Sequence, residues 1–187
     1  IEYGEGTLTD LTCLSELTGL KELRLYAQPM ENLNGIQALL ELETLEIRYC
    51  YALSDASAAF ALPNLRELDL RYTGIESIQG VQNLFSLRRL SISNTQVADL
   101  SPLAAGDFSA AEEEGGFALS AEELLNCEDF SPLSSIHRYS ELNLGNDASD
   151  LWVNSIHDAE ITWFCAYGSF GDPNDLTLLL ADHPELE

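Results

Sequence analysis

The sequence predicts an α/β solenoid of leucine-rich repeats, and its period and its polar alternation support this prediction. Four segments of the form Leu-x-x-Leu-x-Leu/Ile begin at Leu20, Leu42, Leu65 and Leu87, at spacings of 22, 23 and 22 residues. In each segment the last two apolar residues alternate with polar ones, which is the period-two pattern of a strand with one buried face. A fixed period in this range is typical of a solenoid in which each unit supplies one short strand and contacts only its neighbours.

Each strand is expected to be followed by a turn, an apolar anchor and a short helical or extended return. The clearest unit runs from Leu90 to Leu103, and its return begins at Ser101 followed by Pro102. A proline is well placed in a first helical turn, because that turn leaves its backbone amides unpaired. We therefore expect a helix to begin here, with the Ser101 hydroxyl as its capping group.

The chain is interpreted as one repeat domain, residues 1–187, in which the regularity declines toward the C-terminus. The regular repeats cover 1–103, an acidic insertion covers 104–124 and degenerate repeats cover 125–187. Ile1 and Tyr3 align with Leu90 and Ile92, and Leu186 aligns with the first leucine of a further unit. We therefore expect the 187 residues to be a fragment of a longer solenoid, or a solenoid with unusual caps.

Within the irregular part, three segments are expected to form strands: Phe117–Leu119 in the insertion, then Tyr139–Leu144 and Ile161–Trp163. The insertion also carries the glutamate run Glu112–Glu114, which is followed by two glycines. This run is expected to be a solvated loop, and an acidic docking loop is the alternative.

The charge of the chain excludes some partners. With 32 acidic and only 8 basic residues, the formal net charge is −24. Nucleic acid and anionic membrane surfaces are poor partners, because both need a basic patch. No run of apolar residues approaches the length of a membrane span, and no signal peptide is visible. The remaining class of partner is another protein.

No motif in the sequence predicts catalysis, a metal or a cofactor. The three histidines lack the spacing of a zinc site, and no glycine-rich phosphate loop or nucleophile motif is present. Two aspartate-rich segments, 146–150 and 172–175, have oxygen ligands for Ca²⁺ but do not match an EF-hand loop. The cysteines are expected to be free thiols, with Cys50 and Cys127 acting as small buried apolar residues. We therefore predict a protein that is not an enzyme.

Candidate binding residues come from the outward-facing positions of the strands. Parallel strands stack about 4.8 Å apart, so equivalent positions form columns across the sheet. Arginine and tyrosine, the residue types most enriched at binding hot spots, recur in these columns beside carboxylates. The candidate surface comprises Arg24, Tyr26, Glu46, Arg48, Tyr49, Asp69, Arg71 and Tyr72.

Two interpretations of these arginines remain open from the sequence. In the structural interpretation, Arg24, Arg48 and Arg71 form ion pairs with Glu46, Glu67 and Asp69, each contributing less than about 1 kcal/mol. In the functional interpretation, Arg48 and Arg71 are like charges on neighbouring strands, which is unfavourable unless an anionic group lies between them. A binding partner would then supply that group.

The repeats resemble a known family. The phrases Leu-x-x-Leu-x-Leu-x-x-Thr and Asp99-Leu-Ser-Pro-Leu103 are similar to the 22-residue repeats of bacterial internalin-type leucine-rich proteins. The resemblance implies a right-handed horseshoe with a parallel sheet on its concave face, and an extracellular or cell-surface location. The family's asparagine after each strand is replaced here by Gln28, Cys50, Thr73 and Thr95. Those turns are therefore expected to be looser or bonded differently.

These observations lead to one main functional hypothesis and two alternatives. The main hypothesis is a non-enzymatic protein-interaction module that binds its partner through the concave strand face. The first alternative is a structural spacer within a larger cell-surface protein. The second is a recognition arm for an enzyme whose catalytic domain lies outside these residues.

Overall fold

The fold is a right-handed leucine-rich repeat horseshoe, and it confirms the predicted class. A computed structural model describes residues 7–144, 159–162 and 164–166. Its strands are β1 (Glu22–Tyr26), β2 (Thr44–Arg48), β3 (Glu67–Asp69), β4 (Arg89–Ser91), β5 (Phe117–Ser120), β6 (Arg138–Leu144), β7 (Glu160–Ile161) and β8 (Phe164–Ala166). Its helices are the 3-10 turns η1 (Thr12–Leu14), η2 (Ile36–Ala38), η3 (Ser57–Ala61), η4 (Val81–Asn83) and η5 (Ser131–Ser135), and the α-helices α1 (Ser101–Ala104) and α2 (Ser109–Glu113).

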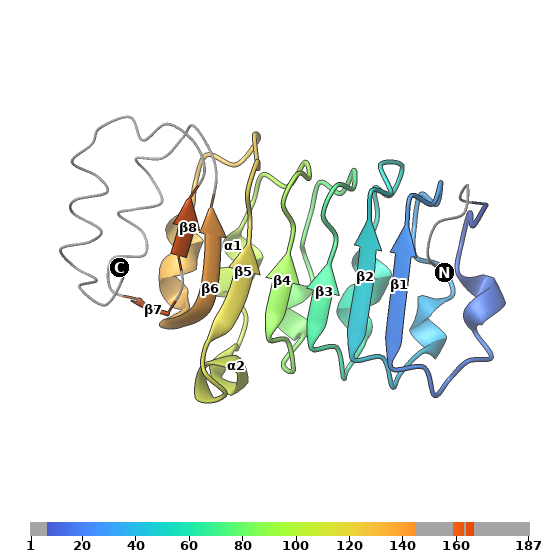
Figure 1. The fold of residues 1–187 in the computed structure, drawn as a ribbon, viewed down its shortest axis with the longest axis horizontal. Coiled ribbons are helices and arrows are strands. Elements are labelled where there is room, and N and C mark those ends of the chain that lie inside the picture. The colour runs from blue at the N-terminus through green and yellow to red at the C-terminus, as the bar shows by residue number, and fades with distance from the viewer. Residues whose placement is uncertain (1–6, 145–158, 163, 167–187) are drawn as a thin grey trace.

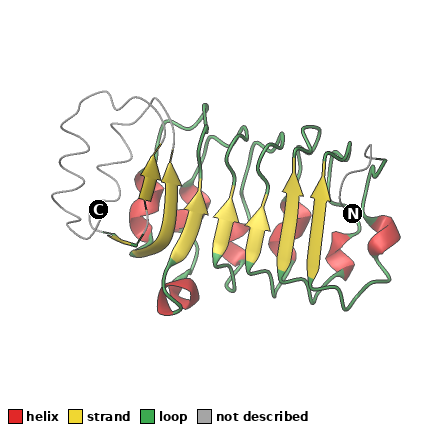
Figure 2. Ribbon diagram, viewed as in Figure 1, coloured by secondary structure: helices red, strands yellow, loops and turns green. Residues whose placement is uncertain are grey.

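The strands form one sheet in chain order, from β1 to β7, with β8 also paired to β6. Every pairing is parallel, and the predicted registers hold: Leu23 lies opposite Leu45, which lies opposite Leu68. Figure 1 shows the strands side by side along the long axis, and Figure 2 shows most of the short helices behind the sheet, with α2 below the end of β5. The sheet lines the concave side, so its outward side chains form one continuous surface.

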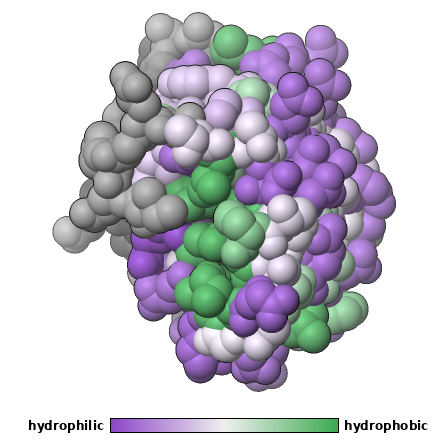
Figure 3. All heavy atoms as spheres, turned by 90° about the vertical axis from the view of Figure 1, so that its right-hand side faces the viewer, coloured by the Kyte–Doolittle hydropathy of each residue, from purple (hydrophilic) through white to green (hydrophobic). Residues whose placement is uncertain are grey.

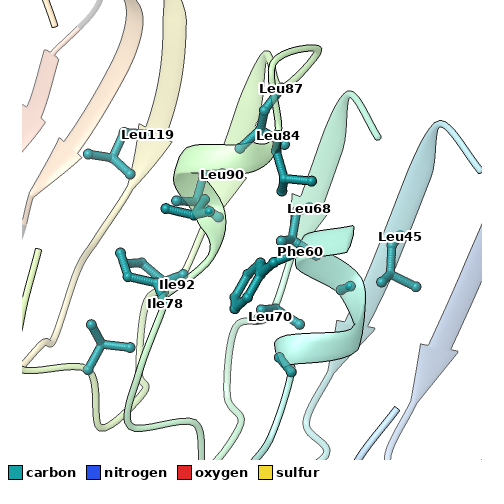
Figure 4. Close-up of a cluster of buried hydrophobic side chains, with 14 of the residues drawn as sticks. Leu45, Phe60, Leu68, Leu70, Ile78, Leu84, Leu87, Leu90, Ile92 and Leu119 are labelled. Atoms are coloured by element: carbon teal, nitrogen blue, oxygen red, sulfur yellow. The ribbon is translucent and has the colours of Figure 1, made fainter. Parts of the chain in front are cut away.

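The core is one continuous cluster of apolar side chains between the sheet and the returns. From Leu42 onward the leucines of the repeat phrase are fully buried, whereas Leu20 of the first unit is only partly buried. Figure 4 shows Leu45, Leu68, Leu90 and Leu119 from four successive strands within the core. Phe60 of η3 fills the space between two returns, where Gly80 leaves room for it. A Cβ atom on Gly80 would lie 2.9 Å from the Cβ atom of Phe60.

The position after each strand, where the family has asparagine, is buried and bonded by several chemistries. The Thr73 and Thr95 hydroxyls donate to the carbonyls of Leu70 and Ile92, each at 2.7 Å. The Gln28 amide donates to the carbonyl of Tyr26 at 2.8 Å. The Cys50 sulfur accepts from the Gln28 backbone N–H at 3.2 Å, and burial raises the pKa of this thiol. Hydroxyl, amide and thiol groups therefore close these turns, in place of an asparagine.

The start of each return is held by a side chain two residues upstream of it. The Asp99 carboxylate accepts from the Ser101 backbone N–H at 2.8 Å and from its hydroxyl at 2.9 Å. The same bond to a backbone N–H is made by the side chains of Asp10, Asn32, Asp55, Ser77, Asp107 and Asp129. The prediction that the Ser101 hydroxyl caps α1 was therefore wrong, because Ser101 is its first residue and Asp99 supplies the acceptor.

The irregular part of the chain still contributes strands to the sheet. The predicted strands at Phe117–Leu119 and Tyr139–Leu144 are confirmed as β5 and β6. The glutamate run was expected to be a loop, but Glu112 and Glu113 instead end the helix α2. Of the third predicted strand, β7 contains Ile161, and Trp163 lies outside the described residues. The two aspartate-rich segments and both expected ends of the solenoid also lie outside them.

The N-terminal end of the described solenoid presents part of the core to the surface. Figure 3 views this end and shows apolar residues gathered within a hydrophilic rim. Leu17 is 51% exposed here, whereas Leu39, Leu62 and Leu84, which hold the same place in later units, are at most 2% exposed. The difference follows from the solenoid geometry, because each unit covers the apolar face of its neighbour.

A candidate interaction surface on the concave strand face

The predicted columns are present on the outward face of the sheet. Arg24 lies opposite Glu46, which lies opposite Asp69, and the column continues through Ser91, Ser120 and Asn143. Ser120 was missed in the sequence because its unit is degenerate. Its signal was the match of Leu119-Ser-Ala to Leu90-Ser-Ile, which places a serine at the same outward position.

The arginines and carboxylates of β1 to β3 form one chain of ion pairs. Arg24 contacts Glu46 at 3.2 Å, and Arg48 contacts both Glu46, at 2.9 Å, and Asp69, at 2.7 Å. Arg71 completes the chain with a 2.7 Å contact to the same Asp69 oxygen. The hydrogen bond to Asp69 raises the pKa of Arg71. Asp69 is thus the anionic group between Arg48 and Arg71, so these two arginines do not require an external anion.

The observed ion-pair chain lacks one residue that the structural interpretation included, Glu67, and contains one that it did not, Tyr26. Glu67 forms no ion pair within the described residues, although it lies on the same strand as Asp69. Tyr26 joins instead, because its hydroxyl donates to the Glu46 carboxylate. This hydrogen bond to the anion raises the pKa of Tyr26.

Tyr49 and Tyr72 lie in the turns just beyond β2 and β3. Their rings stack with centroids 4.6 Å apart and planes inclined by 17°. Both residues have a φ of 59°, in the left-handed region. Ala27, Asn94 and Glu123 at the equivalent turns also have a positive φ, between 51° and 57°. A bulky residue is unusual in this conformation. The repeated turn therefore places the tyrosines side by side at the edge of the concave face.

The surface over β4 to β6 has a different character. Its central positions, Ser91, Ser120 and Asn143, are small and buried. Arg89 and Glu141 pair at 2.6 Å across the intervening strand, where Ala118 lies between them in the register. The two halves together border a polar groove of about 330 Å³, which includes Glu46, Arg48, Asp69 and Arg71 of the candidate surface.

The side chains of the groove are suited to holding a polar partner by hydrogen bonds and charge. No three histidine, cysteine or acidic side chains converge as a metal site requires in the part of the chain that the structure describes. Over the same residues, no helix is long and apolar enough to cross a membrane.

Comparison with known proteins agrees with this architecture. The sequence model of the family described as "Leucine Rich repeats (2 copies)" matches residues 63–105. No curated protein matches the sequence. The structure of internalin C2 from Listeria monocytogenes is 29% identical, with a TM-score of 0.64, over 84% of this chain and 66% of that one. The functional domain of InlJ from the same organism, which includes a cysteine ladder, is 14% identical, with a TM-score of 0.54, over 96% of this chain and 47% of that one.

The fold and the repeat phrase thus define a leucine-rich repeat protein, a class whose extended concave surfaces bind other molecules. Within that class the chain is internalin-like. It spans just under two thirds of internalin C2 and about half of the InlJ domain.

Proposed function

We propose that this chain is a non-catalytic protein-interaction module whose concave strand face binds a partner protein. The contact surface comprises Arg24, Tyr26, Glu46, Arg48, Tyr49, Asp69, Arg71 and Tyr72. The proposal treats residues 1–187 as one repeat domain, with regular, acidic and degenerate parts over 1–103, 104–124 and 125–187. An extracellular or bacterial cell-surface location is proposed from the internalin-like resemblance.

The observation that carries the proposal is the fixed geometry of half-exposed arginines and tyrosines in an otherwise acidic surface. The side chains of Arg48 and Arg71 are 30% and 31% exposed while Asp69 holds both. Tyr49 and Tyr72 are held by their mutual stacking. A partner would meet side chains that are already ordered, so binding would cost less conformational entropy. Residues of these two types contribute most to binding at protein interfaces.

The test is capture of partner proteins on the immobilised chain, comparing the original sequence with Arg48→Ala/Arg71→Ala. If the concave face binds, the double variant loses the captured protein, with an affinity lower by roughly tenfold or more, as for hot-spot arginines. The matched control is Arg66→Ala/Arg138→Ala, which removes the same charge near the opposite ends of the strands. Equal capture by both double variants would contradict the proposal.

A further inference from the structure

The turns that follow the strands differ in length in a regular way. Each strand from β1 to β5 is followed by the buried position where the family has asparagine. After β1, β3 and β4 the next core residue comes two residues later, as from Thr73 to Ile75. After β2 and β5 the interval is three residues, from Cys50 to Leu53 and from Leu124 to Cys127. Two turns with an extra residue therefore flank two turns without one.

The extra residue lets each longer turn close on itself. The Leu53 N–H donates to the Cys50 carbonyl at 2.9 Å, and the Cys127 N–H donates to the Leu124 carbonyl at 3.0 Å. This bond defines a four-residue turn, whose second residue lies at the corner. The corner residues are Tyr51 and Leu125, which are 69% and 79% exposed. Two large apolar side chains therefore project from this edge of the solenoid.

Between these projections lies a groove of about 400 Å³ over the two shorter turns. Gly74 forms part of its lining, and a Cβ atom there would lie 2.7 Å from the Tyr51 carbonyl oxygen. The turns of β2 and β5 are three strand spacings apart, about 14 Å. The two projecting side chains narrow this span. An α-helix with side chains is about 10–12 Å across, so an extended segment fits the groove better.

The chemistry of the groove favours a cation. Tyr49 stacks on one face of Tyr72, and Tyr72 lines the groove whereas Tyr49 does not. Glu123 lies at the same groove and forms no ion pair within the described residues. Tyr72 and Glu123 follow β3 and β5, so they are two strand spacings apart in the same groove. An aromatic ring and a carboxylate that line one groove both attract an ammonium or guanidinium group. The net charge of −24 adds a long-range attraction for basic partners.

We propose that this turn-edge groove binds an extended, basic segment of a partner protein. A lysine or arginine of the segment lies between Tyr72 and Glu123, and its apolar neighbours pack against Tyr51 and Leu125. Tyr72 also belongs to the proposed contact surface on the concave face, but the other lining residues of the groove lie outside that surface. The proposal therefore goes beyond binding by the concave strand face and does not depend on it.

The experiment uses a displayed library of random ten-residue peptides selected on the immobilised chain. Selected peptides are synthesised with a fluorescent label, and their affinities are measured by anisotropy at physiological salt. We expect peptides with lysine or arginine between apolar residues. Tyr51→Ser/Leu125→Ser should weaken their binding by roughly tenfold or more, because large apolar anchors dominate such contacts. Glu123→Gln should weaken it by a smaller factor and reduce its salt dependence.

Two controls separate this groove from other surfaces. Leu40→Ser/Phe85→Ser removes exposed apolar side chains of comparable exposure, 54% and 64%, from other turns and should leave peptide affinity unchanged. Arg48→Ala/Arg71→Ala should also leave it unchanged, which separates this proposal from the proposed concave-face function. The absence of selected binders, selection of acidic peptides, or equal weakening by the Leu40/Phe85 variant would overturn the proposal.

Discussion

The concave face has two halves, the first on β1 to β3 and the second on β4 to β6. The two halves share one backbone register but carry side chains of different size. In the first half, long charged side chains pair across every strand, from Arg24 to Arg71. In the second, Ser91 and Ser120 are short, and Arg89 reaches over Ala118 to Glu141. The first half is thus a surface of paired charged side chains, and the short side chains of the second half continue into a hollow, the polar groove, which both halves border.

This difference shows that the repeat sets where outward side chains lie, and their size sets the shape of the surface. Asp69 lies where the two halves meet and binds both Arg48 and Arg71. It therefore closes the charged ladder and forms one border of the hollow. A partner that binds here would meet fixed guanidinium groups on one side and free space on the other.

The largest expected change in the free energy of unfolding comes from the core, and it tests whether the core is equally important under both halves. Leu68 of β3 and Leu119 of β5 are both fully buried. Leu68→Ala and Leu119→Ala should each lower the free energy of unfolding by about 2–5 kcal/mol, the loss for a buried leucine that leaves a cavity. Urea denaturation measures both. If Leu119→Ala had a far smaller effect than Leu68→Ala, β5 would not be an equivalent unit of the solenoid.

The next largest expected change in stability concerns Asp69, which lies where the two halves meet. Asp69→Asn leaves the guanidinium groups of Arg48 and Arg71 on neighbouring strands without their shared anion. The free energy of unfolding should fall by about 1–3 kcal/mol, as when a partly buried hydrogen-bonded group loses its partner. The control is Glu67→Gln on the same strand, an exposed site whose substitution should change the value by less than about 0.5 kcal/mol. Equal effects of the two variants would show that the ladder does not depend on Asp69.

The smallest expected effect on stability concerns two returns of the second half, which begin with the same aspartate bond as the return of Asp55 in the first half. Bonds from the hydroxyls and N–H groups of Ser101 and Ser131 lower the pKa of Asp99 and Asp129 below the ordinary 3.8. A carboxylate whose pKa is lowered by folding stabilises the fold above its unfolded pKa. This contribution is lost as the pH falls through the folded pKa. Acidification from pH 5 to pH 3 should therefore remove stability supplied by both returns.

Asp99→Asn/Asp129→Asn should flatten that acid dependence, because an asparagine oxygen still accepts the N–H bond and does not titrate. Asn32 already makes this bond in an earlier unit, so the substitution is compatible with the turn. Urea denaturation at several pH values measures the difference between variant and original. Acid also protonates the many other carboxylates and so reduces the repulsion between negative charges. This change is nearly the same in the variant and the original protein, so it cancels when their free energies of unfolding are subtracted. Identical slopes would contradict the assignment of these bonds.

Much of the fold was predictable because a repeat restates the same information in every unit. The strands at Leu42–Ile47 and Leu65–Leu70 and the outward columns followed from period and alternation alone. The degenerate unit around Phe117 was harder, and its serine, Ser120, was missed. The helix at Glu112 and Glu113 was not predicted, because a run of glutamates and glycines favours solvent exposure without specifying the backbone.

The sequence by itself determined the class of fold, the order and register of the strands, and the residues that face outward, because each of these follows from local periodicity. Only the tertiary structure decided which carboxylate each arginine contacts, how Tyr49 and Tyr72 stack, and where Tyr51 and Leu125 frame a groove. These features depend on side chains from units that lie far apart in sequence and meet in space only when the solenoid closes its turns. The extra residue in the 23-residue repeat was visible from the beginning. Its place at the corner of an exposed turn was not.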